Sequence, residues 1–372
     1  MRTTRQILIG RVPVGGGAPV SVQTMTTTDT RDAAATLVQI RAVAAAGCDI
    51  VRVAVPDAAA IDGLKTIAAA SPLPVVADIH FDRRLALAAI AAGAHGIRVN
   101  PGNLGGRPAL REVGRAAAAR NVAVRVGVNG GSLEARFRAK GAKGDDAAAL
   151  AASALDACAV LDAVGCRQVK VSLKSSSVPA TVDACRVFAG QCDYPLHLGV
   201  TEAGPPSVGI IKSAVALGCL LLEGIGDTLR VSLTAPPVEE VRAGLRILEA
   251  CGHRQARPEL ISCPTCGRTE IDLFHLVAEV EAELERLRRA GRPPNLGKIA
   301  IMGCVVNGPG EARDADLGLA GGPGKGVIFR RGEVIGSWPE AELLPAFLNL
   351  LREAAKPAGR QRPPATSKRR GT

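Results

Sequence analysis

Residues 122–128 read Val-Ala-Val-Arg-Val-Gly-Val, an apolar run with an arginine at its fourth position. Such runs are typical of buried strands, and they recur along the chain at 19–24, 49–55, 74–79, 96–100, 122–128, 168–173, 195–200 and 228–233. Between them lie helix-like stretches at 31–46, 57–70, 83–92, 106–120, 146–164, 178–190, 206–218 and 236–250, several of which end in a glycine: Gly47, Gly93, Gly165 and Gly218. Eight alternating units over about 250 residues predict an α/β fold with an N-terminal (β/α)8 TIM barrel over residues 1–251, rather than a doubly wound sheet.

Polar residues occupy every second position of these strands, while the intervening positions, such as Val124 and Val126, are apolar. The polar set is Arg52, Asp78, His80, Arg98, Asn100, Arg125, Asn129, Lys170, Ser172, Lys174, His197, Arg230 and Ser232. Alternate residues of a barrel strand point into the lumen, where buried cations without counter-charge cost several kcal/mol each. An ordinary ion pair explains any one arginine, but cations on five strands predict a polyanionic ligand such as a diphosphate.

Glu202 follows the seventh strand, in Thr201-Glu-Ala-Gly204. An acid at the carboxyl end of a barrel strand is placed to exchange a proton with a ligand there. The alternative for a lone acid after a strand is a helix cap.

A second segment follows Gly252–Pro258, a charged stretch with a proline that we interpret as a linker. Residues 259–355 predict a small α/β domain with a helix at 270–290, a strand at 298–302, a hairpin at 326–330 and 333–336, and a closing helix at 340–354. The Gly-rich stretch 318–326 lacks the G-K-[ST] ending of a phosphate-binding loop.

Three cysteines of this domain have the spacing of metal ligands: Cys263-Pro-Thr-Cys266 and Cys304, with Glu311 seven residues after Cys304. Soft thiolates select zinc or an iron-sulfur cluster, and three of them leave one position for a different ligand. The spacing leaves open a structural zinc with a hidden fourth ligand and an iron-sulfur cluster, and it disfavours a disulfide.

Composition narrows the setting. Most of the ten cysteines have apolar neighbours and no secretion signal is visible at the start, which predicts a cytoplasmic protein with free thiols. The longest apolar run, 214–222, is too short to span a bilayer. The net charge of +11 includes six basic residues of a tail, 356–372, that we expect to be disordered. The chain has only eight aromatic residues, which argues against nucleic acid as a partner.

Several long segments resemble those of one enzyme family, the bacterial 4-hydroxy-3-methylbut-2-en-1-yl diphosphate synthases in their two-domain form. They are Ala77-Asp-Ile-His-Phe-Asp82, Gly96-Ile-Arg-Val-Asn-Pro-Gly-Asn103, Arg125-Val-Gly-Val-Asn129 with Gly131-Ser-Leu-Glu134, Pro195-Leu-His-Leu-Gly-Val-Thr-Glu-Ala-Gly204, Glu223-Gly-Ile-Gly-Asp-Thr-Leu-Arg-Val-Ser-Leu233, Cys263-Pro-Thr-Cys266 and Gly303-Cys-Val-Val-Asn-Gly-Pro-Gly-Glu311. The resemblance runs in order through most of the chain. It departs at Gly130 and Gly131, where the family often has a different small residue first, and in the tail.

The resemblance implies an iron-sulfur oxidoreductase acting on CH or CH2 groups in the non-mevalonate (MEP) isoprenoid pathway. Its substrate would be 2-C-methyl-D-erythritol 2,4-cyclodiphosphate, opened and dehydrated with two electrons from flavodoxin or ferredoxin. By the same resemblance, Cys263, Cys266, Cys304 and Glu311 hold a [4Fe-4S] cluster. Arg52, Arg98, Arg125, Lys174 and Arg230 clamp the diphosphate, and Asp78, His80, Asn100, Asn129, His197 and Ser232 orient it. Glu202 supplies a proton to the departing hydroxyl, and Glu311 yields its place to substrate.

The resemblance also points to a head-to-tail homodimer in which the cluster domain of one chain covers the barrel mouth of the other. The seven residues 252–258 fit this arrangement, because crossing roughly 30 Å of the chain's own barrel would need about nine extended residues. Two other classes stay in view: a zinc-stabilised barrel hydrolase, and a nucleic-acid-binding module that uses the basic tail.

Overall fold

The structure is a computed structural model that describes residues 2–137, 146–254, 258–304 and 312–355. The chain divides into two compact units, Met1–Arg254 and Gln255–Thr372, and each is described by itself. Glu311 and the tail after residue 355 lie outside the described residues, as do positions 255–257 of the predicted linker. Among the described helices, none is long and apolar enough to cross a membrane.

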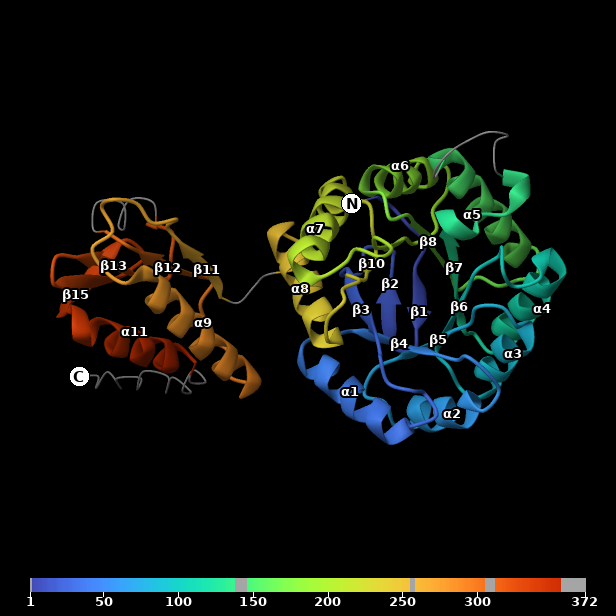
Figure 1. The fold of residues 1–372 in the computed structure, drawn as a ribbon, viewed down its shortest axis with the longest axis horizontal. Coiled ribbons are helices and arrows are strands. Elements are labelled where there is room, and N and C mark those ends of the chain that lie inside the picture. Colours follow the sequence, from blue (N-terminus) through green and yellow to red (C-terminus); the bar gives the residue numbers. More distant parts are fainter. Residues whose placement is uncertain (1, 138–145, 255–257, 305–311, 356–372) are drawn as a thin grey trace, which may run out of the picture. The chain divides into compact units, whose positions relative to one another are not determined.

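Eight parallel strands form the barrel of the first unit (Figure 1). They are β3 (Ser21–Met25), β4 (Ile50–Ala54), β5 (Val75–Asp78), β6 (Gly96–Val99), β7 (Ala123–Asn129), β8 (Val169–Lys174), β9 (His197–Leu198) and β10 (Thr228–Leu229). Neighbours pair from β8 through β3 to β10 and β9, and a single bridge, Val171 to Leu196, brings the two edges together. The predicted barrel is confirmed. Its last strand ends at Leu229 rather than Leu233, and beyond it the Leu233 amide donates to the Glu240 carboxylate.

Eight helices surround these strands, as the sequence predicts (Figure 1). They are α1 (Ala33–Ala45), α2 (Ala60–Ala70), α3 (Arg83–Ala91), α4 (Gly106–Ala119), α5 (Ala147–Asp162), α6 (Val178–Ala189), α7 (Pro206–Leu222) and α8 (Pro237–Ala250). Gly47, Gly93 and Gly165 adopt the left-handed conformation that ends a helix. Gly218 does not end α7, which continues for another turn to Leu222.

The strand alternation is confirmed as well. The apolar positions, such as Val124, Val126 and Val169, join the buried core beneath the helices. The alternate positions, such as Arg125 and Lys170, are also buried, and their side chains therefore fill the lumen.

A short antiparallel hairpin that the sequence reading missed closes the other end of the barrel. Its strands are β1 (Ile7–Ile9) and β2 (Val12–Val14), and both lie across the barrel's centre in Figure 1. Ile7, Ile9 and Val14 pack against Ile50 and Val76 at the first residues of the strands. This apolar plug seals the end of the lumen opposite the strands' carboxyl ends.

In its described residues, the second unit is a five-stranded sheet with two helices packed on one face. The strands are β11 (Glu259–Ser262), β12 (Lys298–Met302), β13 (Leu317–Gly322), β14 (Lys325–Arg330) and β15 (Glu333–Pro339), in that order. Helices α9 (Leu273–Arg289) and α11 (Glu340–Ala354) pack on the sheet through Leu276, Val280, Phe347 and Leu351. The Gly-rich stretch at 318–326 is no loop but the hairpin of β13 and β14.

Candidate active site

The predicted site residues gather at the carboxyl ends of the barrel strands. Asp78 ends β5, Asn129 ends β7 and Lys174 ends β8, while Glu202 and Arg230 follow β9 and β10. Parallel strands bring these ends together at one mouth, where TIM barrels bind their ligands.

Asp78 is the centre of the charged network. Its carboxylate lies 3.7 Å from Arg52 Nε, 3.5 Å from Arg98 Nη1 and 3.5 Å from His80 Nε2. Burial opposes ionisation of Asp78, but Arg52, the hydrogen bond from His80, and Arg98 outweigh it and hold its pKa well below the usual range. Asp78 therefore carries a negative charge that fixes two arginine heads side by side.

Two further buried cations, Arg125 and Lys174, lie on the neighbouring strands β7 and β8. Burial, followed by the charges of Arg52 and Arg98, lowers the pKa of Arg125 well below its ordinary value. Burial, together with Arg125 and Arg52, does the same to Lys174. Among the described residues, Arg125 Nε and Nη1 find no hydrogen-bond acceptor. Buried donors of this kind are satisfied when an anion enters.

A lower polar layer lies beneath these groups. Lys170 is fully buried, and its Nζ donates to Gln23 Oε1 at 3.4 Å. His197 Nδ1 lies 3.4 Å from Thr228 Oγ1, whereas its Nε2 has no partner among the described residues. Burial, and then Arg125 and Lys174, lower the pKa of His197 well below 6.5, so its ring is neutral.

Arg230 is paired inside the protein. Glu240, which is 3% exposed in the first turn of α8, accepts from Arg230 Nη2 at 3.0 Å and from Nε at 3.2 Å. The same carboxylate accepts from Thr24 Oγ1 at 2.6 Å and from the Leu233 amide at 3.0 Å. Arg230 thus differs from Arg125, because a buried carboxylate already neutralises its charge.

Three predicted orienting residues have distinct surroundings. The Asn100 amide is engaged within its own loop, donating to Ser132 Oγ at 2.6 Å and accepting from Gly102 N at 3.0 Å. With its oxygen turned to the lumen, the Asn129 amide accepts from Arg98 Nη2 at 3.1 Å. Ser232 lies beyond the end of β10 and is partly exposed.

Glu202 is exposed at the mouth and has φ of +53°, a left-handed backbone that is rare outside glycine. Such strain is retained mainly where function requires it, and here it turns the loop after β9. Glu202 comes after β9 in the chain and lies at the same end of the barrel as Lys174.

The three cysteines of the second unit line one cavity of about 220 Å³, together with Thr265, Thr269 and Gly303. Two backbone amides already point at sulfur: Gly303 N lies 3.2 Å from Cys263 Sγ and Arg268 N lies 3.5 Å from Cys266 Sγ. Within the described part of the chain, no three His, Cys, Asp or Glu side chains are close enough to hold a metal ion. The predicted fourth ligand, Glu311, is outside the described residues.

Thr269 connects the two cysteine loops. Its Oγ1 accepts from the Cys266 amide at 3.0 Å, and its side chain packs against Gly303, where a Cβ would lie 2.9 Å from Thr269 Cγ2. The amide of Glu270 donates to the Gly303 carbonyl at 3.1 Å. This joint fixes the segment that carries Cys304 beside the Cys263–Cys266 loop.

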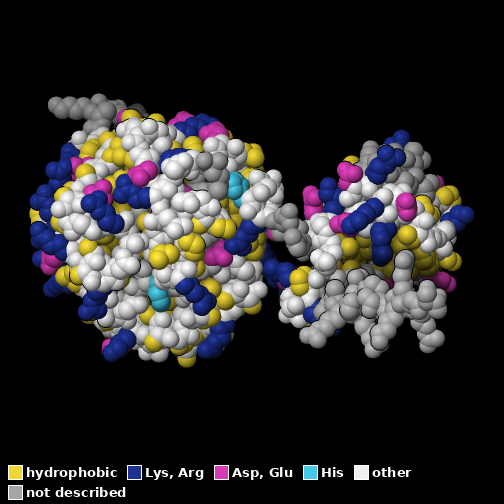
Figure 2. All heavy atoms as spheres, turned by 180° about the vertical axis from the view of Figure 1, so that it is seen from behind, with side chains coloured by type: hydrophobic (Ala, Val, Ile, Leu, Met, Phe, Trp, Pro, Cys, Tyr) yellow, Lys and Arg dark blue, Asp and Glu magenta, His cyan; other side chains and the backbone are white. Residues whose placement is uncertain are grey.

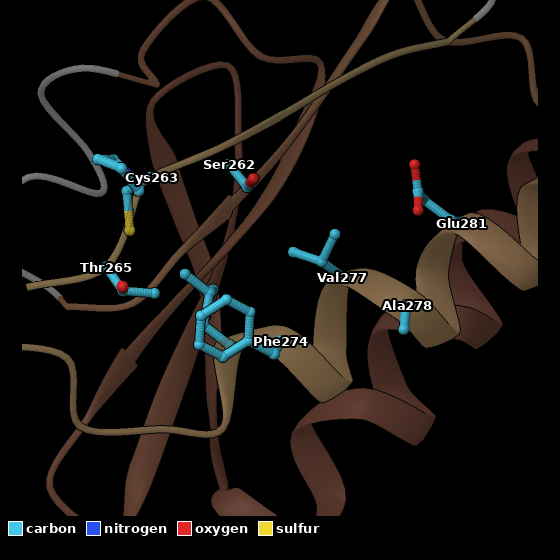
Figure 3. Close-up of a pocket in the computed structure, with 9 residues that line it drawn as sticks. Ser262, Cys263, Thr265, Phe274, Val277, Ala278 and Glu281 are labelled. Carbon is cyan, nitrogen blue, oxygen red and sulfur yellow. The ribbon is translucent and has the colours of Figure 1, made fainter. Parts of the chain in front are cut away.

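Cys263 also borders a second hollow, of about 380 Å³, between its loop and helix α9. Figure 3 shows Cys263 and Thr265 on one side of this hollow, with Phe274 and Val277 from α9 on the other. The Phe274 side chain is largely exposed at its edge.

The surface arginines of the barrel are dispersed and mostly paired. Figure 2 shows Lys and Arg side chains spread over the face in view, with Asp and Glu among them. Arg31, Arg83, Arg107 and Arg186 each form ion pairs with carboxylates. On the face in view, the basic side chains of the barrel are therefore interspersed with acidic ones.

Sequence reasoning missed Glu240, Thr24, Gln23 and Ser132. Glu240 occupies the first turn of a helix, where acidic residues are common because they interact favourably with the helix dipole. Its position in the sequence therefore did not indicate a role in the site. Gln23 could have been found, since it lies on the lumen-facing positions of β3 with Ser21.

Comparison with known proteins agrees with this geometry. The GcpE TIM-barrel domain matches residues 4–245, and the GcpE protein C-terminal domain matches residues 259–353. A protein of Geobacter sulfurreducens is 55% identical over 345 residues, which is 93% of this chain and 96% of that protein. One of Salinispora arenicola is 52% identical over 97% of this chain and 91% of its own length. Both are named 4-hydroxy-3-methylbut-2-en-1-yl diphosphate synthase (flavodoxin).

Among solved structures, dihydropteroate synthase of Yersinia pestis superposes with a TM-score of 0.50 at 13% identity, over 68% of this chain and 100% of that one. At this identity, the likeness concerns the fold alone. The domain matches and the highly identical relatives extend through both units, and they show that the chain belongs to the GcpE family.

Proposed function

We propose that this protein is a 4-hydroxy-3-methylbut-2-en-1-yl diphosphate synthase of the MEP pathway. It would convert 2-C-methyl-D-erythritol 2,4-cyclodiphosphate by reductive ring opening and loss of a hydroxyl as water. The observation that carries the proposal is the set of buried, under-neutralised cations at the barrel mouth, in a chain whose relatives bear this name. Flavodoxin, which the relatives' names give, is the electron donor we propose, with ferredoxin as the alternative.

The chain's own residues would divide the work. Arg98 and Arg125 would bind the diphosphate, because Arg98 is held by Asp78 and Asn129 and Arg125 has donors free in the described lumen. Lys174 and Arg52 would add charge as the ring C–O bond breaks and the diphosphate gains a negative charge. His197, Asn129 and His80 would orient the substrate. Asn100, whose amide is engaged with Ser132, would instead hold the loop after β6.

Glu202 would donate the proton to the departing hydroxyl, from its place at the mouth. A carboxyl group is a suitable general acid when it can lose and regain a proton close to the working pH. Arg230 and Ser232 would border the site, and Arg230 would act through the pair with Glu240 rather than as a free cation.

The second unit suits an iron-sulfur cluster. Cys263, Cys266 and Cys304 would hold a [4Fe-4S] cluster, with Glu311 as a labile oxygen ligand. When bound, the cluster would supply the two electrons of the reaction one at a time. Backbone amides directed at the sulfurs of Cys263 and Cys266 stabilise thiolates, and all three cysteines line the same cavity. Zinc remains the alternative for the same thiolates, and iron and sulfide analysis separates the two.

We also propose a head-to-tail homodimer in the cytoplasm, with the site shared between chains. Arg254, the last described residue of the first unit, donates to Asp49 at the amino end of β4, opposite the mouth. Five residue steps, spanning at most about 18 Å, then lead from Arg254 to Glu259 at the start of β11. Helix α7 exposes Val208, Ile211, Val215 and Leu222 on one side, an apolar row that self-association would cover. The reducing location is supported by the other seven cysteines, none of which forms a disulfide.

The activity is tested with anaerobically purified protein, reduced flavodoxin and the cyclic diphosphate, with the product identified by mass spectrometry. Absence of product from a preparation that contains four irons per chain would refute the reaction. Sharing is tested by mixing Glu202→Gln chains with Cys304→Ser chains, each inactive alone. Recovery of activity supports shared sites, and none despite proven subunit exchange refutes them.

A further inference from the structure

Two glycines face the barrel lumen where the strand alternation would place side chains. Gly127 follows Arg125 by two residues on β7, and Gly199 follows His197 by two residues after β9. Neither has a left-handed backbone, so their conformations would accept any residue. Some other requirement must keep these positions without a side chain.

The requirement at Gly127 is the head of Arg98. A Cβ on Gly127 would lie 2.8 Å from Arg98 Nε, too close for carbon and nitrogen, and 3.4 Å from Arg98 Nη2, which is ordinary contact. The guanidinium lies over the bare Cα with Nη1 3.5 Å from Asp78 and Nη2 3.1 Å from Asn129. Arg98 Nε has no acceptor in the described lumen.

Gly199 meets Lys174 in the same way. A Cβ there would lie 2.4 Å from Lys174 Nζ and 2.7 Å from the backbone oxygen of Arg230. Lys174 and Arg98 are both at least nine-tenths buried. Each glycine therefore leaves space for a cation from a neighbouring strand: Gly127 for Arg98 and Gly199 for Lys174.

We infer that Gly127 and Gly199 are positioning residues of the anion site, which set Arg98 and Lys174 against the diphosphate. This rests on the proposed function for the identity of the anion. At Gly127, the crowded atom, Arg98 Nε, belongs to a side chain, and the next neighbour, Ser172 Oγ at 3.4 Å, is at ordinary contact distance. An added methyl group would therefore push Arg98 aside and leave β7 in place. At Gly199, a backbone oxygen is crowded too, so substitution there would also disturb the β9–β10 ladder.

The test uses the full-length protein and compares Gly127→Ala with Gly190→Ala. Gly190 ends α6, and a Cβ there would meet atoms no closer than 3.6 Å. Crystal structures without ligand locate Arg98, and calorimetry measures affinity for the cyclic diphosphate and for inorganic pyrophosphate. In Gly127→Ala, we expect Arg98 to leave Asn129 and both affinities to fall about tenfold to hundredfold, the scale of one charge-assisted contact. Gly190→Ala should match the parent.

A double variant separates positioning from a general structural effect. If Gly127 acts through Arg98, then adding Gly127→Ala to Arg98→Ala causes no further loss of affinity. An equal further loss, or an unmoved Arg98 in Gly127→Ala, overturns the inference. Should Gly127→Ala fail to fold, recovery of folding in the double variant supports crowding by Arg98, and failure to recover overturns it.

The proposed function and this inference fail separately. A parent protein that binds pyrophosphate but not the cyclic diphosphate contradicts the proposed substrate. The place of Arg98 in the ligand-free Gly127→Ala structure still decides whether Gly127 positions it.

Discussion

The buried pair of Glu240 and Arg230 gives a quantitative prediction for Glu240→Gln. The carboxylate accepts four hydrogen bonds, two from Arg230, one from Thr24 and one from Leu233. Glutamine keeps the shape but loses the charge, and its NH2 group meets donors on Arg230. Breaking one side of a buried ion pair costs about 3–5 kcal/mol. At about 2–4 °C per kcal/mol for a domain of this size, the barrel's thermal midpoint should fall by about 6–20 °C.

The matched control is Glu239→Gln, the preceding residue of α8. Glu239 is 46% exposed and pairs with Arg242 on the surface, a contact worth about 0–1 kcal/mol. Scanning calorimetry with and without pyrophosphate measures both variants. Because Glu240→Gln leaves Arg230 unneutralised, pyrophosphate should raise its midpoint more than that of the parent. A Glu240→Gln midpoint equal to that of Glu239→Gln would show that the pair contributes no stability.

Three further predictions follow from the site. Arg125→Leu should weaken binding of the cyclic diphosphate by a few kcal/mol, measured by calorimetry, because Arg125 has donors without acceptors in the described lumen, and unchanged affinity would show that it does not face the ligand. Burial, and then Arg125 and Lys174, keep the pKa of His197 below 6.5, so below that pH the unfolded chain binds a proton that the folded chain does not. The thermal midpoint should therefore decrease as the pH is lowered below 6.5, and it should decrease less in His197→Gln. Parallel pH profiles of the midpoint in the two proteins would contradict this. Cys304→Ser should lose most iron and sulfide on analysis whereas Glu311→Ala keeps part of the cluster but loses most activity; equal cluster content and activity in Glu311→Ala and the parent would exclude Glu311 as a ligand.

The barrel was predictable because its signals are local and repeated. Six of the eight strands are four to seven residues long, apolar and polar residues alternate in strands such as β7 and β8, and a helix follows each strand. The hairpin β1–β2 was missed because strands of three residues are too short to show alternation. Its apolar side chains gain their meaning only from Ile50 and Val76, which lie far along the chain.

The lumen cations were predictable as a set but not as individuals. Alternation showed which way Arg98, Arg125 and Arg230 point, since that depends on the strand alone. Their partners depend on elements distant in sequence: Arg98 meets Asp78 from β5, whereas Arg230 meets Glu240 from α8. Sequence reasoning therefore treated Arg230 and Arg125 alike, although only three-dimensional packing gives Arg230 a carboxylate.

The hairpin β1–β2 closes the barrel at the end where its strands begin, and this has a kinetic consequence. Ile7, Ile9 and Val14 fill the end where the strands begin, so a molecule held among the lumen cations has the mouth as its exit. The next substrate enters and the last product leaves through the same mouth, so the two events cannot overlap in time. Product inhibition should therefore be competitive with substrate. Whatever covers the mouth during turnover also sets the residence time of the product.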